Sequence, residues 1–332
     1  MRWLLMAALF GAVLGTTWLV SEYRAFQRTP LSIPAQGLLY GVAPGTSLQG
    51  LAADLHSRGI LQRPKFLIWA GRIQRLSERL RAGEYQLTKG ITPLELLQLL
   101  VSGKVVQHSL TIVEGWTFHR LMEAIDAHEA LVHTLQDLDD RRIMARLGYP
   151  DQHPEGHFFP ETYNFPRGMS DLEFLRRAYD TMERKLATAW AARAPELPLK
   201  TAYEALILAS IVERETGLAE ERSRIAGVFI RRLKKGMLLQ TDPTVIYGIG
   251  KDFDGNIRRR DLLTDTPYNT YTRAGLPPTP IALPGGTAID AVMRPAPGDT
   301  LYFVARGDGS HYFSRTLQEH NQAVARFQLR RR

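Results

Sequence analysis

The strongest constraint on this chain is a run of 18 residues without a charged side chain, residues 3–20 (WLLMAALFGAVLGTTWLV). As an α-helix the run would be about 27 Å long, close to the roughly 30 Å hydrocarbon thickness of a bilayer. Trp3 and Trp18 lie near its ends, where aromatic side chains favour the membrane interface. The residues that follow, SEYRAFQRTP, contain no cleavage site of the A-x-A kind, so we expect an uncleaved transmembrane anchor rather than a signal peptide.

The flanking charge predicts an orientation. Arg2 and the α-amino group precede the apolar run, and positive charge favours the cytoplasmic side of a membrane. We therefore expect a single-pass protein of the cell inner (cytoplasmic) membrane, with a cytoplasmic N-terminus and the rest of the chain periplasmic. The anchor is predicted to occupy residues 1–20.

Composition excludes several classes of protein. The chain has 332 residues, 44% of them hydrophobic, which suits two modest folded domains with connectors. It has no cysteine, which excludes disulfide scaffolds, thiol nucleophiles and Cys-ligated metals. Its nine histidines show no metal-binding spacing, and we expect no metal and no cofactor. The net charge of +8 permits an anionic partner, but no RNA- or DNA-binding motif is present, so we expect no nucleic acid.

The residues after the anchor divide into a connector and a small module. Residues 21–34 are predicted to be a linker and residues 35–108 a compact module. Thr46 with Gln49 fits a capping box at the start of a helix, and a second apolar helix and a strand at 83–87 follow. This β-α-α-β order resembles a LysM module, a small carbohydrate-binding fold.

The remainder is predicted to be a larger mixed α+β domain, residues 109–332. It should be mainly helical over 116–199, and its core at 201–332 carries the densest motifs before a closing β-hairpin. Capping boxes at Thr92–Glu95 and Ser170–Glu173 mark helix starts in the two domains. The predicted class is therefore α+β, with a single N-terminal transmembrane helix.

Two carboxylates end an apolar segment. Residues 205–212 (ALILASIV) are almost wholly apolar, which predicts a buried helix, and Glu213 and Glu215 follow at once. Burial raises the pKa of a carboxyl group, as a general acid near neutral pH requires. Periodicity does not decide which of the two faces inward. Alternatively, both are the charged end of a core helix, paired with Arg214 or Arg222.

Two loops are rich in Tyr, Asn and Thr. The segment 239–248 is followed by 267–271 (PYNTY) and by the proline-rich residues 275–278. Aromatic faces and amide side chains of this kind suit sugar recognition. An ordinary structural loop explains the same residues equally well.

Five motifs in order give a specific resemblance: IVERET at 211–216, LQTDPTVIYG at 239–248, YNTY at 268–271, GLPP at 275–278 and IALPG at 281–285. With the anchor and the LysM-like part, the chain resembles the MltG-type (YceG-like) endolytic murein transglycosylase family over nearly its whole length. The resemblance implies a YceG-like catalytic domain over residues 109–332. It also implies a lyase that cuts the bond between N-acetylmuramic acid and N-acetylglucosamine in peptidoglycan without water, leaving a 1,6-anhydro end.

The resemblance places the catalytic carboxylate at Glu213. Neutral Glu213 would protonate the glycosidic oxygen, and its carboxylate would then accept the proton of the muramic C6 hydroxyl. Predicted substrate contacts are Gln240, Tyr268, Asn269, Tyr271 and Glu161.

Two other functions stay open. One is a hydrolytic muramidase with Asp242 or Glu161 as the second carboxylate that ordinary glycosidases need. The other is a non-catalytic peptidoglycan-binding scaffold. The expected partners are glycan strands, the membrane and, as the family implies, peptidoglycan synthases.

Overall fold

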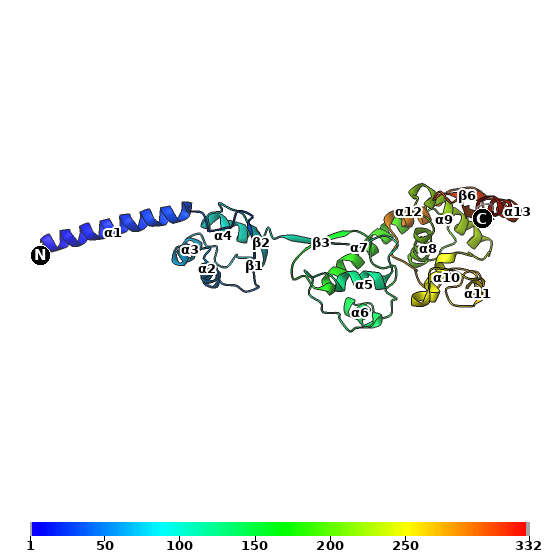
Figure 1. Ribbon diagram of the computed structural model, residues 1–332, viewed down its shortest axis with the longest axis horizontal. Coiled ribbons are helices and arrows are strands. Elements are labelled where there is room, and N and C mark those ends of the chain that lie inside the picture. The colour runs from blue at the N-terminus through cyan, green and yellow to red at the C-terminus, as the bar shows by residue number, and fades with distance from the viewer. Residues whose placement is uncertain (1, 330–332) are drawn as a thin grey trace. The chain divides into compact units, whose positions relative to one another are not determined.

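A computed structural model describes residues 2–329, and residues 1 and 330–332 lie outside the described part. The fold is mixed α+β, as predicted (Figure 1). The chain forms two compact units: unit 1 comprises Met1–His108 with Asn164–Gly168, and unit 2 comprises Ser109–Tyr163 with Met169–Arg332.

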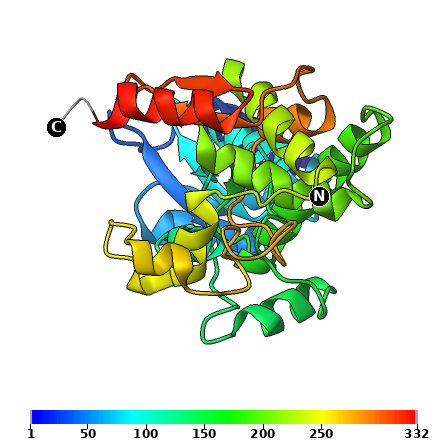
Figure 2. The same ribbon diagram turned by 90° about the vertical axis from the view of Figure 1, so that its right-hand side faces the viewer.

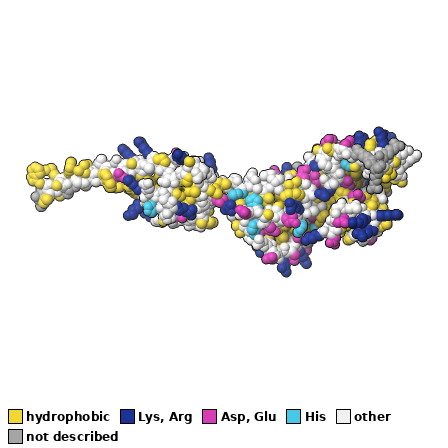
Figure 3. All heavy atoms as spheres, viewed as in Figure 1, with side chains coloured by type: hydrophobic (Ala, Val, Ile, Leu, Met, Phe, Trp, Pro, Cys, Tyr) yellow, Lys and Arg dark blue, Asp and Glu magenta, His cyan; other side chains and the backbone are white. Residues whose placement is uncertain are grey.

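The N-terminal helix α1 (Arg2–Arg28) contains the apolar run. Its segment Trp3–Arg28 is long and apolar enough to cross a membrane, by length and composition. Its large apolar side chains are exposed, as Figure 3 shows at the N-terminal end of the chain. The hydroxyl groups of Thr16 and Thr17 donate to carbonyls one turn back in the same helix, which satisfies them without water.

Residues 21–34, predicted to be a linker, do not form a free connector. Helix α1 continues through them to Arg28. Phe26, Leu31 and Ile33 are buried in the core of unit 1. These residues are buried because they are apolar and pack on the rest of unit 1. The Phe26 ring, for example, contacts the Phe66 ring edge-on at a centroid distance of 5.5 Å.

Unit 1 is built on a two-stranded antiparallel sheet in which Tyr40 faces Tyr85. Its elements are β1 (Leu38–Val42), α2 (Leu48–Ser57), α3 (Pro64–Ile73), β2 (Gly83–Leu87) and α4 (Pro93–Ser102). The order β1-α2-α3-β2 is the predicted one, while the LysM assignment itself stays a prediction.

Helix starts in unit 1 agree with the sequence in one case and differ in another. The capping box of Thr92 and Glu95 at α4 is confirmed. The capping box predicted for Thr46 and Gln49 is wrong, because Ser47 is the N-cap of α2 and accepts from the Gly50 amide. The Thr46 hydroxyl instead donates to the carbonyl of Ala43.

Helices α7, α9, α10 and α12 among the remaining elements pack against helix α8. In chain order the remaining elements are β3 (Gln107–Thr111), α5 (Phe118–Asp126), α6 (Asp140–Leu147), β4 (Thr162–Pro166), α7 (Asp171–Ala191), α8 (Ala202–Glu215), α9 (Ala219–Lys234), α10 (Asp242–Ile249), η1 (Gly250–Asp252), α11 (Arg259–Leu263), α12 (Gly286–Met293), β5 (Tyr302–Ala305), β6 (His311–Ser314), α13 (Leu317–Val324) and η2 (Ala325–Leu329). Strand β3 pairs with β4, and β5 with β6.

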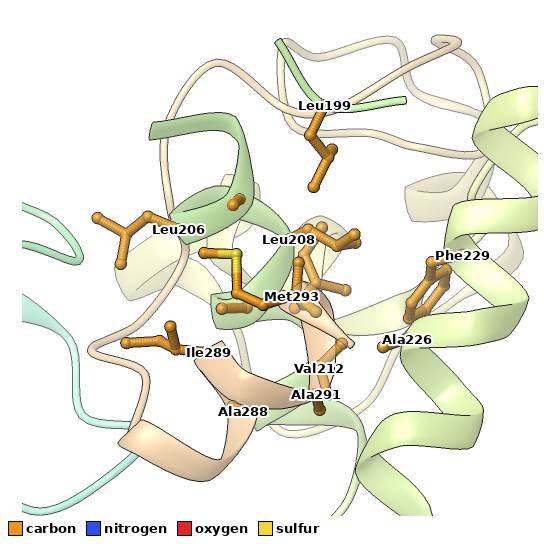
Figure 4. Packing of buried hydrophobic residues seen from close by; sticks show 14 of the residues in the cluster. Leu199, Leu206, Leu208, Val212, Ala226, Phe229, Ala288, Ile289, Ala291 and Met293 are labelled. Carbon is orange, nitrogen blue, oxygen red and sulfur yellow. The ribbon is translucent and has the colours of Figure 1, made fainter. Parts of the chain in front are cut away.

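Helix α8 is the centre of unit 2. All eight residues of its apolar segment, 205–212, are buried, as predicted. Helices α9 and α12 pack against it, and Figure 4 shows Leu208 and Val212 beside Phe229 and Met293. The predicted hairpin is β5–β6, on which α13 packs (Figure 2). A helix enclosed in this way holds the residues at its C-terminal end in fixed positions.

Candidate active site

The C-terminal end of α8 is where the motif IALPG meets the motif IVERET. The amide of Ile281 donates to the Ser210 hydroxyl at 3.0 Å. Three residues further along α8, the amide of Gly285 donates to Oε2 of Glu213 at 2.9 Å. Segment 281–285 is thereby bound along α8 by side chains of α8 itself.

The motifs LQTDPT and YNTY meet at the same end of α8. The Thr241 hydroxyl donates to Oε1 of Glu215. The Thr241 amide donates to the Thr270 hydroxyl at 3.1 Å, and the Thr244 hydroxyl lies 2.9 Å from the same oxygen. Buried threonine hydroxyls therefore join three motifs that are distant in sequence.

Glu213 lies in a nearly closed, positively charged environment. Its side chain is 4% exposed, and its Oε1 accepts from Nη2 of Arg222 at 2.7 Å. Its other oxygen faces the N-terminus of α12, because Gly285 is the N-cap of that helix. Burial raises the pKa of Glu213 and Glu114 raises it further, while the Gly285 amide and Arg222 oppose this shift. The described geometry therefore suits a carboxylate that can take up a proton when one donor withdraws.

Glu114 is a second carboxylate at this point, and the sequence interpretation missed it. Its Oε2 lies 3.4 Å from Nη2 of Arg222, the nitrogen that also donates to Glu213. The Glu114 carboxyl lies directly over Gly285, where a Cβ atom would overlap it unless Glu114 moved. The hydroxyl of Thr287 accepts from the other Arg222 nitrogen. No sequence pattern pairs Glu114 with Glu213, since 99 residues separate them.

Glu215 has a separate environment. Burial raises its pKa to about 7, the nearby Asp242 adds to the rise, and the hydrogen bond from Thr241 opposes it. Among the described residues, Glu215 and Glu213 share no hydrogen-bond partner. The pairing with Arg222 that the sequence left open is present for Glu213.

A cleft of about 570 Å³ lies beside Arg214, the residue after Glu213. Glu155 lines it, is 3% exposed, and accepts from the Phe118 amide at 3.0 Å and from the Tyr247 hydroxyl at 3.1 Å. Burial raises the pKa of Glu155 to about 7. The sequence interpretation also missed Glu155, although it lies in the aromatic, proline-rich segment 154–168.

Three predicted substrate contacts lie in or near these loops. Tyr268 lines the cleft, with its ring 4.9 Å from that of Tyr247. The Tyr271 hydroxyl donates to Asp242 at 2.6 Å, and burial raises its pKa. Gln240 is exposed and has a left-handed backbone, with φ of 50°.

The other two predicted contacts are placed differently. Asn269 is 1% exposed, and its amide nitrogen donates to three carbonyls at the end of α11. Glu161 is exposed, and its carbonyl accepts from the Ile112 amide. In the described part of the chain, neither residue forms a hydrogen bond or ion pair with Glu213. Between residues 2 and 329 no cluster of His, Asp or Glu side chains is arranged to hold a metal ion.

Comparisons with known proteins place the chain in a family. The YceG-like family model matches residues 40–326. An endolytic murein transglycosylase of Bacillus subtilis is 31% identical over 303 residues, which cover 86% of this chain and 83% of that protein. One from Streptococcus pneumoniae is 27% identical, and the match covers 86% of this chain but 57% of that longer protein. A crystal structure of a yceG-like protein from Listeria monocytogenes has a TM-score of 0.56 and 28% identity, covering 87% of this chain and 99% of that one.

Proposed function

We propose that Glu213 is the single catalytic acid and base of this chain, which belongs to the YceG-like family and is a peptidoglycan lytic transglycosylase. The observation that carries the assignment is its burial beside one arginine and one helix N-terminus, at a point where a second carboxylate competes for the arginine. Burial and Glu114 together raise the pKa of Glu213, which favours the protonated form that a general acid needs.

The first step is protonation of the glycosidic oxygen. In the described state both oxygens of Glu213 accept hydrogen bonds, from Arg222 and from Gly285. Nη2 of Arg222 already lies 3.4 Å from Glu114, so a small movement transfers this donor from one carboxylate to the other. Oε1 of Glu213 is then free to carry the proton. As the leaving sugar takes that proton, the bond to the anomeric carbon breaks.

In the second step the Glu213 carboxylate accepts the proton of the muramic C6 hydroxyl, whose oxygen bonds to the anomeric carbon. The nucleophile belongs to the substrate, so holding the sugar in place supplies a large effective molarity. No second carboxylate is required, unlike in a hydrolase. This step closes the 1,6-anhydro ring and returns the proton to Glu213.

We assign substrate contact to Tyr268, Tyr271 and Gln240. Tyr268 offers a ring face in the cleft, and exposed Gln240 offers an amide. The amide of Asn269 is occupied by backbone carbonyls, so its contribution is to shape the loop that carries both tyrosines. Glu161 is exposed and is retained as a contact to a more distant sugar.

The proposed setting is the outer face of the inner membrane. Helix α1 would anchor the chain with its N-terminus in the cytoplasm, the LysM-like module 35–108 would bind glycan, and residues 109–332 would cut it. An anchored enzyme reaches only glycan near the bilayer, which suits nascent strands beside peptidoglycan synthases. The basic balance of the chain suits an anionic wall polymer.

The test is digestion of uncrosslinked glycan strands by the full chain, with mass spectrometry of the products. We expect anhydro-ended fragments, one water lighter than hydrolysis products. Glu213→Gln should lower the rate by about 10²–10⁴-fold. Glu220→Gln, an exposed glutamate on the next helix, is the matched control and should keep the wild-type rate.

Three results would contradict the assignment. Full cleavage by Glu213→Gln would remove its catalytic role. Fragments with ordinary reducing ends would show hydrolysis, with Glu114, which shares Arg222 with Glu213, as a candidate second carboxylate. A wild-type chain that cut no glycan would favour the non-catalytic scaffold.

A further inference from the structure

We propose that the exposed face of α3 is a second membrane contact, which binds anionic lipid headgroups beside the anchor α1. This inference rests on α1 crossing the membrane and is independent of the catalytic assignment. We call the face the α3 platform and define it by its four exposed residues, Lys65, Trp69, Arg72 and Ile73.

The α3 platform is held at the end of the apolar span. Helix α1 continues without interruption from the apolar run to Arg28. The Tyr23 ring lies 5.3 Å from the Trp69 ring and 5.9 Å from the Phe66 ring. Glu22 forms an ion pair with Arg63 at the start of α3. The base of the span and α3 therefore form one packed body within unit 1.

The geometry places the α3 platform at the depth of the headgroups. The charge-free run ends at Val20, and Tyr23 lies three residues, or about 4.5 Å, further along the helix axis. The headgroup layer extends about 5–7 Å beyond the hydrocarbon on each side of a bilayer. Trp69, in contact with Tyr23, is thus at interface depth. A groove of about 490 Å³ continues from Trp18 to Lys65 and Phe66 at the same level.

The residue types are those that favour an interface. Trp69 is 44% exposed and Ile73 is 60% exposed, although both are large apolar side chains. Lys65 and Arg72 flank them at helical spacing. Aromatic and aliphatic side chains with neighbouring Lys and Arg are typical of segments that lie in the membrane surface.

The surrounding charge favours an anionic lipid over a neutral one. Residues 63–81 contain six basic side chains and one acidic side chain. Figure 3 shows Lys and Arg side chains gathered where α1 enters unit 1. Lys and Arg side chains near an anionic bilayer surface are attracted to its headgroups. Because α1 already brings the bilayer to this face, the bilayer is the occupant that we assign to it.

The test uses the absence of native cysteine, which makes a single introduced cysteine unique. The full chain with Ile73→Cys carries an environment-sensitive fluorophore and is reconstituted in vesicles of phosphatidylcholine with phosphatidylglycerol. A lipid that bears a quencher on its headgroup reports proximity. Leu39→Cys is the matched control, since Leu39 is 48% exposed on β1. Leu14→Cys, with a quencher on the acyl chain, reports whether α1 spans the bilayer.

We expect quenching at position 73 to be several-fold stronger than at position 39. Omitting phosphatidylglycerol, or introducing Lys65→Glu with Arg72→Glu, should weaken it toward the control value. Equal quenching at positions 73 and 39, with strong quenching at position 14, would overturn the proposal. Strong quenching at position 73 that is unchanged without phosphatidylglycerol and in the double glutamate variant would overturn it as well. Absence of quenching at position 14 would overturn it together with the anchor. Cleavage of soluble glycan strands is not affected by any of these outcomes, so the catalytic proposal is tested separately.

Discussion

The two units differ in the polar residues that they bury beside their apolar cores. In unit 1 the buried residues of the described chain are apolar or tyrosine, such as Leu51, Leu67 and Tyr85. The fourteen buried polar or charged residues of the described chain all belong to unit 2, and they include Glu155 and Arg222. Buried polar groups cost stability unless each finds a partner. The comparison shows that unit 1 is organised for packing and that unit 2 retains costly groups where its chemistry is proposed.

The partners of these groups explain how unit 2 tolerates them. Glu155, Glu213 and Glu215 each accept at least one hydrogen bond from a fixed donor, yet burial raises the pKa of all three. Strongly shifted pKa values are concentrated at functional sites more often than elsewhere. Substitutions in the two units should therefore have different effects.

The largest effect is expected in the apolar core. Leu67→Ala removes a fully buried side chain of α3 and should destabilise unit 1 by about 2–5 kcal/mol, because a cavity is left behind. Hydrogen exchange of the α2 and α3 amides, followed by mass spectrometry, measures this loss within unit 1. Leu263→Ala, at a residue that is 67% exposed, is the control and should change protection little. A loss below about 1 kcal/mol for Leu67→Ala would contradict the view of unit 1 as a tightly packed core.

The burial of Glu155 should make the stability of unit 2 depend on pH. The pKa of Glu155 is about 7 in the folded chain and 4.5 for the free group. The folded state therefore binds more protons at Glu155 between these values, so the contribution of Glu155 to stability is greatest below about pH 4.5 and falls as pH rises to about 7. The full loss corresponds to about 3 kcal/mol. Glu155→Gln should remove this share of the slope and leave the share that the buried Glu215 contributes.

Denaturant unfolding of unit 2 at low and neutral pH measures the difference, with Glu161→Gln as the exposed control. The Glu155 interpretation fails if wild type and Glu155→Gln lose the same stability over this pH range.

Substitution of Arg222 and of Glu114, the two charged neighbours of Glu213, should shift the pH profile of activity in opposite directions. Arg222 lowers the pKa of Glu213 and Glu114 raises it. The alkaline limb of kcat/KM, on which a general acid loses its proton, should move to higher pH in Arg222→Gln and to lower pH in Glu114→Gln. The pH profile of glycan cleavage measures both shifts. If the alkaline limb moved in the same direction in Arg222→Gln and in Glu114→Gln, the two residues would not act on activity through the pKa of Glu213.

The smallest effect is expected from loss of a helix N-cap, and it should be about the same in the two units. Thr92→Ala at α4 and Ser170→Ala at α7 each remove the side chain of a capping box at an exposed helix start. Each should cost about 1 kcal/mol, because cap energies depend on local hydrogen bonds and not on the core below. Local hydrogen exchange at the first turn of each helix measures the loss. A marked difference between the two caps would show that core chemistry extends to the helix ends.

Local signals accounted for much of the fold. The buried stretch 205–212 and the caps at Thr92 and Ser170 were predictable because each depends on a few neighbouring residues. The cap at Thr46 was wrong because Ser47, one residue further on, has an equivalent hydroxyl, and loop geometry decides between them. Sequence alone cannot rank two adjacent capping residues of this kind.

The candidate site was less predictable because its charges meet through long-range contacts. Glu213 followed from its place at the end of a buried helix, together with the family motif. Glu114 and Glu155 are brought in by segments whose approach depends on the whole unit, through Arg222 in one case and Phe118 and Tyr247 in the other. Asn269 could be read equally as a sugar ligand or a loop residue, and its three carbonyl partners are visible only in three dimensions.

The unbroken passage of α1 into unit 1 has a mechanical consequence. A flexible linker between α1 and unit 1 would allow unit 1 to reorient freely relative to the helix. Here Tyr23 and Phe26 lie on α1 and also pack in the core of unit 1, so α1 and unit 1 are joined without a flexible linker. In the proposed membrane setting, a change in bilayer thickness that tilts α1 is therefore expected to tilt unit 1 with it. The membrane would in that case set the orientation of the first folded unit.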